Sequence, residues 1–530
     1  MTSNVLITGK LHPEAIQAFE NDPDINLVYK PDCRFDQFKD ALQSAQVLVT
    51  RSETAIDKNL IDNAPQLKIV ARAAVGVGNI DLKYATDKGI LVMNTPGKNT
   101  NSAAELTLGL MLGMLRHLPE SHSHMKNGGW DRHMFTGLEL RAKKIGLVGL
   151  GNVGHRVAKF CLGFDAEVLA YDPYISPSVF HKNRVQQVNS LEELADQVDI
   201  LSVHVPKNNE TTGMVTTDIL RRLGPTSFFV NAARGGVADE QDLLSALNEG
   251  LIKGAALDTF DNEPEPLKAL VDHDKCWVSP HIGASTLEAQ LAIGKTVYEQ
   301  VKKATEGAVV DYHVNLPDIG VIDSSQIKTY STLAEKLGST VGQILDFNPR
   351  EVRVQYRGDI AEMDNSLIKL SFMKGYADQV VDGFVSFVNA SQEFEKLGIQ
   401  TIEDSDPHFD SYRSALKVTV IGNANESLTI GGVVFEDRHL RLTLLNDFYF
   451  EVEPRGHMVL VQNEDKPGVI GELGIELAKE NVNISSFHLS RNKKGGNAMA
   501  LLGVDSPISS QQLSHIEKIQ HVQRVKAIRL

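Results

Sequence analysis

Cysteine is scarce in this sequence, and long apolar runs are missing. The three cysteines, Cys33, Cys161 and Cys276, lie far apart among 530 residues. Their odd number and wide spacing indicate neither a disulfide framework nor a cysteine metal site, and we expect no metal. No apolar run reaches the length of about 18 residues that a membrane helix needs, so we expect no membrane partner.

Positive charge is also in deficit. The chain has 53 lysines and arginines against 68 acidic residues, a formal net charge of −15. Nucleic-acid binding draws on a basic surface, so we expect no nucleic-acid partner. Residues 1–4 lead directly into the apolar run 5–8, without the basic and apolar regions of a signal peptide, and we expect a cytoplasmic protein.

The chain is too long for one domain, because single cores stop growing near about 250–300 residues. Short apolar strands alternate with helical stretches in two successive series, which predicts an α/β fold with two parallel-sheet domains of the Rossmann or flavodoxin kind. The first series has expected strands at 5–8, 47–50, 67–71 and 90–93. The second has expected strands at 145–148, 168–171, 200–204, 228–231, 255–257 and 277–279, followed by a helix over 287–305.

The remaining residues change character. Residues 318–455 predict an α+β module, with helices at 327–345 and 377–388, an extended segment at 352–354 and β-like runs at 416–421, 428–435, 440–444 and 448–452. The last segment, 456–530, has the order strand, helix, strand, strand, helix, strand, which is typical of a ferredoxin-like βαββαβ unit.

A glycine fingerprint marks a dinucleotide site. Gly149, Gly151 and Gly154 follow the apolar strand 145–148 and precede a helical run. The first glycine suits a tight turn, the second close approach of the pyrophosphate, and the third close packing of helix on strand. Asp172 ends the next strand, where a carboxylate binds the adenosine ribose and repels a 2′-phosphate. The sequence therefore predicts NAD as the cofactor.

Three ionisable residues follow strands of the second series: Arg234, Glu263 and His281. Ligands of open α/β sheets bind beyond the carboxyl ends of the strands, so these side chains are expected near the cofactor. Oxidising an alcohol by hydride loss needs a base near neutral pH, which histidine provides. A carboxylate can orient that imidazole, and an arginine can bind a substrate carboxylate through two hydrogen bonds.

These motifs resemble those of the D-isomer-specific 2-hydroxyacid dehydrogenases over about residues 5–315. The resemblance also rests on the loops 231–236, 255–260 and 280–286, and it is strongest to the long members that oxidise D-3-phosphoglycerate with NAD in L-serine biosynthesis. It implies His281 as acid and base, Glu263 as its partner, Arg234 as the carboxylate ligand and Asp258 as the ligand of the nicotinamide carboxamide. The implied cofactor contacts are Gly149, Gly151, Asn152, Val153, Gly154, Asp172, Ala232, Asp258, His281 and Gly283.

The resemblance also implies a catalytic half of two domains. Residues 1–98 and 286–317 would form the substrate-binding domain, and 99–285 the NAD-binding domain. Arg51 matches an arginine of the substrate site, and the loop after Arg72 is similar to one that holds the substrate carboxylate through its amides. The substrate contacts would be Arg51, Ala73, Ala74, Val75, Gly76, Arg132 and Arg234. Some relatives have a second arginine where this chain has Glu53, so a phosphate contact could come instead from Arg132 or Arg141 across a dimer interface.

The C-terminal unit, 456–530, resembles an ACT domain, a small-molecule sensor that pairs between chains. The effector L-serine would contact Asn463, Asp465 and Asn483, although a module used only for assembly is an alternative. Residues 318–455 resemble the intervening domain of the long family members, with an open role as effector site, spacer or oligomer contact. We expect a homo-oligomer, with dimers through the catalytic domains and a tetramer through the C-terminal modules.

Other functions are compatible with part of these signals. A related reductase could act on glyoxylate, hydroxypyruvate or 2-oxoglutarate, and 2-oxoglutarate reduction could be a side activity. Arg51 and the ACT-like unit argue against the first two substrates. A dinucleotide-sensing protein without turnover is a further alternative, which the complete set of Arg234, Glu263 and His281 disfavours.

Overall fold

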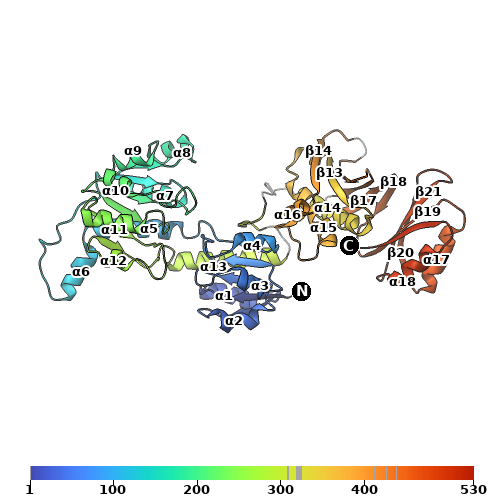
Figure 1. Ribbon diagram of the computed structural model, residues 1–530, viewed down its shortest axis with the longest axis horizontal. Helices are drawn as coiled ribbons and strands as arrows, with labels where there is room; N and C mark the ends of the chain where they lie inside the picture. The colour runs from blue at the N-terminus through green and yellow to red at the C-terminus, as the bar shows by residue number, and fades with distance from the viewer. Residues whose placement is uncertain (1, 307–309, 318–324, 410–411, 425, 437) are drawn as a thin grey trace.

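The computed structural model describes residues 2–306, 310–317, 325–409, 412–424, 426–436 and 438–530. Its strands form four sheets, each built from a separate stretch of chain. Along the long axis in Figure 1, the second sheet lies at one end and the fourth at the other, with the first and third between them. Within the described ranges, no helix is long and apolar enough to cross a membrane.

The first sheet has five parallel strands in the order β2-β1-β3-β4-β5. They are β1 (Ser3–Ile7), β2 (Ile25–Tyr29), β3 (Val47–Thr50), β4 (Ile69–Arg72) and β5 (Leu91–Met93). Their helices are α1 (Pro13–Asn21), α2 (Phe35–Leu42), α3 (Lys58–Asp62) and α4 (Leu82–Asp87). This is the doubly wound order of flavodoxin-like sheets.

Alternate residues of these strands enter two cores, as expected for strands buried on both faces. One core contains α1 and the later helix α13 (Leu287–Thr305), and the other contains α2, α3 and α4. A Cβ atom on Gly294 of α13 would lie 2.6 Å from Cβ of Ala15, so this glycine permits the close approach of the two helices. The chain thus returns to the first sheet after completing the second.

The second sheet has seven parallel strands in the order β12-β11-β10-β9-β6-β7-β8. They are β6 (Lys144–Val148), β7 (Glu167–Tyr171), β8 (Gln186–Gln187), β9 (Ile200–Val203), β10 (Phe228–Asn231), β11 (Gly254–Leu257) and β12 (Cys276–Val278). The order reverses between β6 and β9, and the crevice at such a switch point is where open α/β sheets bind ligands.

Helices cover both faces of this sheet. One core includes residues of α5 (Thr100–Leu115), α7 (Asn152–Gly163) and α8 (Pro177–Lys182). The opposite core includes residues of α9 (Leu191–Ala195), α10 (Thr217–Leu223), α11 (Glu240–Glu249) and α12 (Lys268–Val271). By contrast, α6 (Leu118–Lys126) buries none of its residues.

The third sheet has six strands in the order β14-β13-β15-β16-β17-β18, and only the β13–β14 pair is parallel. The strands are β13 (Pro349–Gly358), β14 (Gln400–Asp406), β15 (Ser414–Gly422), β16 (Ser427–Phe435), β17 (His439–Leu445) and β18 (Phe448–Val452). The helices are α14 (Ser325–Ile344), the 3-10 turn η1 (Asp359–Glu362), α15 (Ser366–Val380) and α16 (Ala390–Lys396).

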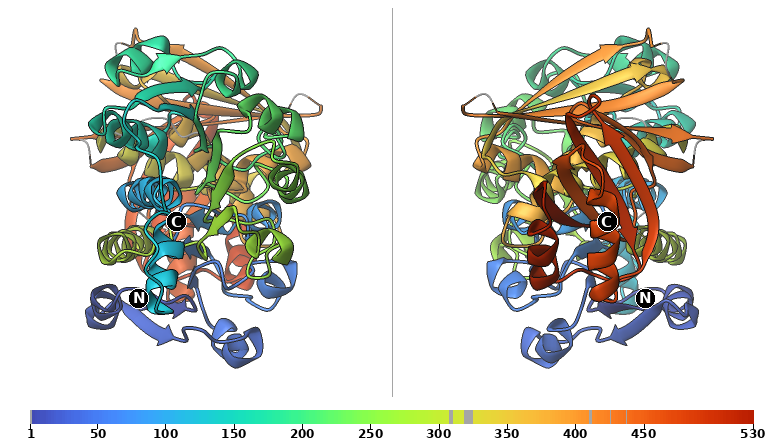
Figure 2. Two further views of the ribbon diagram at one scale, coloured as in Figure 1. Left: turned by 90° about the vertical axis from the view of Figure 1, so that its left-hand side faces the viewer. Right: turned by 90° about the vertical axis from the view of Figure 1, so that its right-hand side faces the viewer.

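The fourth sheet is antiparallel, in the order β20-β21-β19-β22. Its elements are β19 (His457–Glu464), α17 (Val469–Lys479), β20 (Ile484–Arg491), β21 (Asn497–Val504), α18 (Ser510–Glu517) and β22 (Val522–Arg529). Both helices contribute to a core on one face, while Met458, Leu460 and Leu501 join the core of the third module on the other. The right-hand view of Figure 2 shows this module, in red, in front of the third sheet.

The expected helix over 377–388 is wrong beyond Val380. Helix α15 ends at Val380, Val381 is extended, and Gly383 has a φ of 136°, a conformation that interrupts a helix. Asn389 then closes a turn by accepting a hydrogen bond from the Ser386 amide at 2.8 Å. The expected elements do not include strands β2, β8 and β14, and β14 is polar and largely exposed, which leaves no apolar run to reveal it.

Candidate active site

The glycine fingerprint forms the turn between β6 and α7. Gly149 has a φ of 94°, and a Cβ atom there would lie 2.9 Å from the carbonyl oxygen of His204. A Cβ on Gly154 would lie 2.2 Å from the Gly149 carbonyl oxygen, so α7 can sit this close to the strand only without that side chain. Gly151 faces open space, which leaves room for a pyrophosphate beside the backbone.

The first residues of α7, Asn152 and Val153, present backbone amides at a helix N-terminus, which favours an anion. Asp172 follows β7 and accepts hydrogen bonds from the amides of Leu150 at 2.9 Å and Tyr174 at 3.0 Å. Its carboxylate is therefore fixed beside the turn. These residues fit a dinucleotide with a free ribose 2′-hydroxyl, as NAD has.

The loop after β10 carries Ala232 and Arg234, and a buried asparagine shapes it. Asn231 accepts from the Ala233 amide at 3.0 Å and donates to the Arg234 carbonyl at 2.9 Å. A Cβ on Gly235 would lie 1.8 Å from the Phe260 carbonyl oxygen, so this loop packs directly on the one that leads to Glu263. Burial lowers the pKa of Arg234, and Glu263 opposes that shift.

His281 and Glu263 form a pair. Imidazole Nδ1 lies 2.7 Å from Oε2 of Glu263, and the other carboxylate oxygen accepts from the Phe260 amide at 2.9 Å. His281 has a φ of 52°, which is uncommon for a residue with a side chain. The carboxylate is fixed at both oxygens, so it can hold the imidazole in one orientation and leave Nε2 for a ligand.

Asp258 holds the backbone of the His281 loop. Its buried carboxylate accepts from Ser279 Oγ at 2.6 Å, the Ile282 amide at 2.8 Å and the Gly283 amide at 2.9 Å. These bonds bracket His281 in sequence. Asp258 and Gly283 therefore belong to one hydrogen-bond network. Both carboxylate oxygens of Asp258 already accept hydrogen bonds in this network, so a nicotinamide carboxamide would have to share one of those oxygens.

Across from these loops lies the segment after β4. Arg72 is 6% exposed, and its Nε donates to the Gly76 carbonyl at 3.1 Å. Its Nη1 is buried and has no hydrogen-bond partner among the described residues. Burial lowers the pKa of Arg72 to about 10, with Glu53 raising it and Arg51 and Arg234 lowering it further. A buried donor without a partner is rare, and it suits an anionic ligand.

The same segment meets Arg234. A Cβ on Gly76 would lie 3.0 Å from Nη2 of Arg234, so the two loops touch. The carbonyls of Ala74 and Val75 accept from the Thr95 amide at 3.1 Å and from Asn94 Nδ2 at 2.8 Å. Ala73 donates its amide to the Thr50 carbonyl at 2.8 Å, which makes it a poor candidate for an amide contact with the substrate.

Arg51 lies on the same side of the first sheet. Its Nη1 donates to Gln290 Oε1 at 2.9 Å and to the Lys10 carbonyl at 3.1 Å. Glu53 is exposed, and it contributes to the charge around Arg72. The structure thus groups Arg51, Arg72, Gly76 and Arg234 in one region.

Arg132 is not part of this group within one chain. It is exposed and follows α6, which extends away from the body of the second module in Figure 1. Exposed apolar side chains also lie on this projection, at Leu118, Met125, Trp130 and Met134. Trp130 is 82% exposed, an unusual position for the largest apolar side chain.

The expected effector residues lie at opposite ends of the fourth sheet. Asn463 and Asp465 are at the end of β19 that pairs with Asn497, whereas Asn483 bonds Asp505 beyond the other end of β21, at 2.6 Å. Asn463 is 3% exposed and donates to the Glu464 carbonyl. The Gly495 amide and Arg491 lower the pKa of Asp465. One chain does not bring these three residues together.

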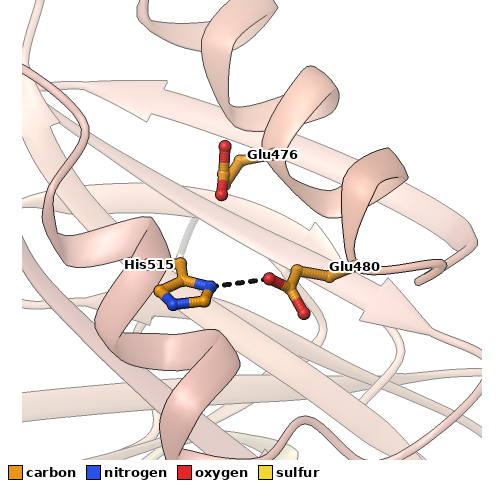
Figure 3. A group of neighbouring side chains, drawn as sticks. All are labelled: Glu476, Glu480 and His515. Atoms are coloured by element: carbon orange, nitrogen blue, oxygen red, sulfur yellow. Dashed lines mark hydrogen bonds and ion pairs between the residues drawn. The ribbon is translucent and has the colours of Figure 1, made fainter.

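A second histidine–carboxylate group lies in the same module. Glu476 of α17, Glu480 at the end of that helix and His515 of α18 face one another (Figure 3). Their possible ligand atoms lie within 4.8 Å of one another. His515 Nδ1 lies 2.6 Å from Glu480 Oε1, and Lys479 donates to Glu476 at 2.8 Å. Each of the three side chains thus has one polar partner, and the His515–Glu480 contact joins the two helices.

The family comparison agrees with this geometry. A family model described as "D-isomer specific 2-hydroxyacid dehydrogenase, NAD binding domain" matches residues 108–283, and one described as "D-3-phosphoglycerate dehydrogenase intervening domain" matches 326–446. The first match covers the glycine turn and the loops of Arg234, Glu263 and His281. The fold and site define an NAD-dependent oxidoreductase of the 2-hydroxyacid dehydrogenase class.

Curated relatives indicate which family within this class the chain resembles. The D-3-phosphoglycerate dehydrogenase of Methanocaldococcus jannaschii is 34% identical over 528 residues, 99% of each chain. That of Bacillus subtilis is 33% identical over 526 residues, again 99% of each. A crystal structure of a protein from Thermus thermophilus matches with a TM-score of 0.55 and 29% identity, covering 59% of this chain and 99% of that one. The chain belongs to the D-3-phosphoglycerate dehydrogenase family.

The sequence analysis does not predict three residues that the structure places at the site. Asn231 ends a buried strand at the ligand edge of the sheet, and its polarity there is a usable signal. Gln290 lies in a long amphipathic helix, where nothing distinguishes it from a surface glutamine. Ser279 belongs to a recognisable motif, but its bond to Asp258 depends on the folded loop.

Proposed function

We propose that the protein oxidises D-3-phosphoglycerate to 3-phosphohydroxypyruvate with NAD, the reaction that opens L-serine biosynthesis. Family membership supports the class of reaction. The observation that carries the substrate is the grouping of Arg51, Arg72 and Arg234, because a substrate with a phosphate and a carboxylate needs several cations in an acidic protein. The buried, unpartnered Nη1 of Arg72 supports an anionic occupant.

The domains follow from this proposal. Residues 1–98 and 286–317 would form the substrate-binding domain and 99–285 the NAD-binding domain, with the substrate between the loops that meet at Gly76 and Arg234. Residues 318–455 would be the intervening domain and 456–530 the ACT domain. Arg51 and the loop 73–76 lie after strands of the first sheet, and Arg234, Glu263 and His281 lie after strands of the second.

Different side chains of the protein would bind the substrate and transfer the proton. Arg234 binds the substrate carboxylate and polarises the developing carbonyl, while Arg51 and the loop 74–76 hold the remaining anionic oxygens. His281 takes the hydroxyl proton on Nε2, because Nδ1 faces Glu263. Glu263 stabilises the imidazolium that results. Bound NAD supplies the acceptor for the hydride that leaves C2.

A substrate panel tests the proposal. Purified protein at fixed NADH is expected to give its highest kcat/KM with 3-phosphohydroxypyruvate, ahead of hydroxypyruvate, glyoxylate and 2-oxoglutarate. NADPH is expected to be a poorer reductant, because the fixed carboxylate of Asp172 repels a 2′-phosphate. A higher kcat/KM with any unphosphorylated acid would overturn the substrate assignment.

We further propose that catalytic domains pair through α6 and the segment after it. The exposed side chains of Leu118, Met125, Trp130 and Met134 support this, since such patches mark interfaces. Arg132 would then reach the partner's site. A Trp130→Glu variant is expected to lose this dimer in sedimentation, and an unchanged assembly would contradict the pairing. The cytoplasmic location stays a prediction.

The fourth module is proposed to sense L-serine at an interface between two chains. Its βαββαβ order supports the ACT assignment. The separation of Asn463 and Asp465 from Asn483 supports an interface, because only a second chain could bring the two ends together. Initial rates against added L-serine test this, with inhibition that an Asn483→Ala variant relieves. Rates unaffected by serine would leave the module a role in assembly alone.

A further inference from the structure

Gln290 connects the two sides of the proposed active site. It lies in the first turns of α13, and its Nε2 donates to the Ala284 carbonyl at 2.7 Å. Ala284 belongs to the loop that carries His281. The carboxamide oxygen of the same residue accepts from Arg51 Nη1 at 2.9 Å, across 239 positions of sequence. One side chain therefore joins the acid–base loop to the arginine of the first sheet.

Arg51 is held through one guanidinium nitrogen, which leaves its other nitrogens available to a ligand. Its Nη1 is occupied by Gln290 and the Lys10 carbonyl, while Nε and Nη2 have no hydrogen bond within the described part of the chain. A Cβ on Gly9 would lie 2.6 Å from Arg51 Cγ, so the stem of the arginine is confined as well. The guanidinium is thus presented with two free donor positions, the arrangement that a phosphate or carboxylate recognises.

We infer that Gln290 is a positioning residue that couples the binding of the substrate's phosphate at Arg51 to the placement of the His281 loop. The inference rests on the proposed function. A phosphate that binds Nε and Nη2 of Arg51 fixes the guanidinium, and Gln290 passes that constraint to Ala284, three positions after His281. The binding energy of the phosphate, which is remote from the reacting carbon, then helps to align His281 with the C2 hydroxyl.

The carboxamide is suited to this role because it donates and accepts at once. Leucine has a similar size and can do neither. Glutamate could pair with Arg51, but its carboxylate would repel the Ala284 carbonyl and compete with the substrate phosphate for the guanidinium. A purely structural glutamine would respond differently, because its loss would affect all substrates alike.

The test compares Gln290→Leu with the control Gln300→Leu. Gln300 lies on the same helix, about 15 Å further along at a rise of about 1.5 Å per residue. Its carboxamide also donates and accepts at once, to the Asp311 carboxylate at 3.0 Å and from the Asp311 amide at 2.9 Å. We expect Gln290→Leu to lower kcat/KM for 3-phosphohydroxypyruvate about 10²-fold, including a fall in kcat, and to lower it several-fold less for hydroxypyruvate. Gln300→Leu is expected to keep the wild-type ratio of the two substrates.

A double-mutant cycle with Arg51→Ala separates coupling from independent damage. If Gln290 acts through Arg51, the double variant is expected to be little worse with the phosphorylated substrate than Arg51→Ala alone. Additive losses, or an equal loss for both substrates, would overturn the inference. Failure of the wild-type enzyme to prefer the phosphorylated substrate would instead overturn the proposed function, so the two failures are distinguishable.

Discussion

Three histidine–glutamate pairs occur among the described residues, and two of them have nearly equal geometry. His281 and Glu263 lie 2.7 Å apart beside the second sheet, and His515 and Glu480 lie 2.6 Å apart on the helices of the fourth module. All four side chains are partly exposed. By the pair alone, either could be an acid–base site.

Their surroundings differ. The His281 loop is fixed by the buried carboxylate of Asp258, and the second oxygen of Glu263 is held by a backbone amide. A partly buried guanidinium, Arg234, lies close enough to Glu263 to influence it. Near His515, by contrast, the charged neighbour Lys479 is bonded to Glu476. The geometry of a pair alone therefore does not identify a catalytic site. The His281–Glu263 pair is distinguished by side chains held in a fixed orientation and by a nearby hydrogen-bond donor, Arg72 Nη1, that has no partner among the described residues.

The most damaging change is expected at the base itself. His281→Ala should lower kcat on the order of 10²–10⁴-fold, because no other group would take the hydroxyl proton. His515→Ala is the matched control, and we expect its kcat to equal that of the wild type. Steady-state rates with D-3-phosphoglycerate and NAD measure both. Near-wild-type turnover by His281→Ala would remove the distinction between the pairs.

Arg234 is expected to be next in effect. In Arg234→Lys the charge is kept but the planar fork is lost, so kcat/KM should fall on the order of 10²-fold. Arg524→Lys is a suitable control, because Arg524 of the fourth module also meets a carboxylate, that of Asp346, far from the catalytic loops. Equal kcat/KM for the two variants would show that the guanidinium near Glu263 has no special role.

The parts of this site that depend on local chain geometry are predictable from the sequence. The turn at Gly149 and the carboxylate at Asp172 are predictable because a strand, a turn and a helix follow one another within about two dozen residues. Helix α13 is predicted with the observed bounds, since its apolar spacing is regular. Strand β2 is missed, although its sequence Ile25–Tyr29 is β-like.

Contact across distant segments is what sequence patterns do not supply. The bridge from Arg51 through Gln290 to Ala284, and the approach of Gly76 to Arg234, depend on how two sheets meet. The same limit applies to the two pairs compared above. His515 and Glu480 are 35 positions apart, and only the packing of α18 on α17 makes them neighbours.

A subtler difference between the pairs should appear in pH dependence. Glu263→Gln removes the carboxylate that orients His281 and stabilises the imidazolium formed on proton transfer, so the rising limb of the pH–rate profile for alcohol oxidation should change, with a lower maximum. Glu480→Gln is expected to leave the profile unchanged. Profiles of kcat/KM for D-3-phosphoglycerate measure this. An unaltered limb in Glu263→Gln would remove its role as the partner of His281.

The smallest effect is expected for the pair on the helices. Partly exposed ion pairs contribute about 0–1 kcal/mol, because solvent screens the charges and side-chain order opposes the gain. Glu480→Gln should therefore shift the urea midpoint of the fourth module only slightly, and its kcat should be that of the wild type. A large shift of the midpoint, or a change in kcat, would mean that the Glu480–His515 contact couples α17 and α18 to the catalytic domains, and the contrast between the two pairs would then be one of degree.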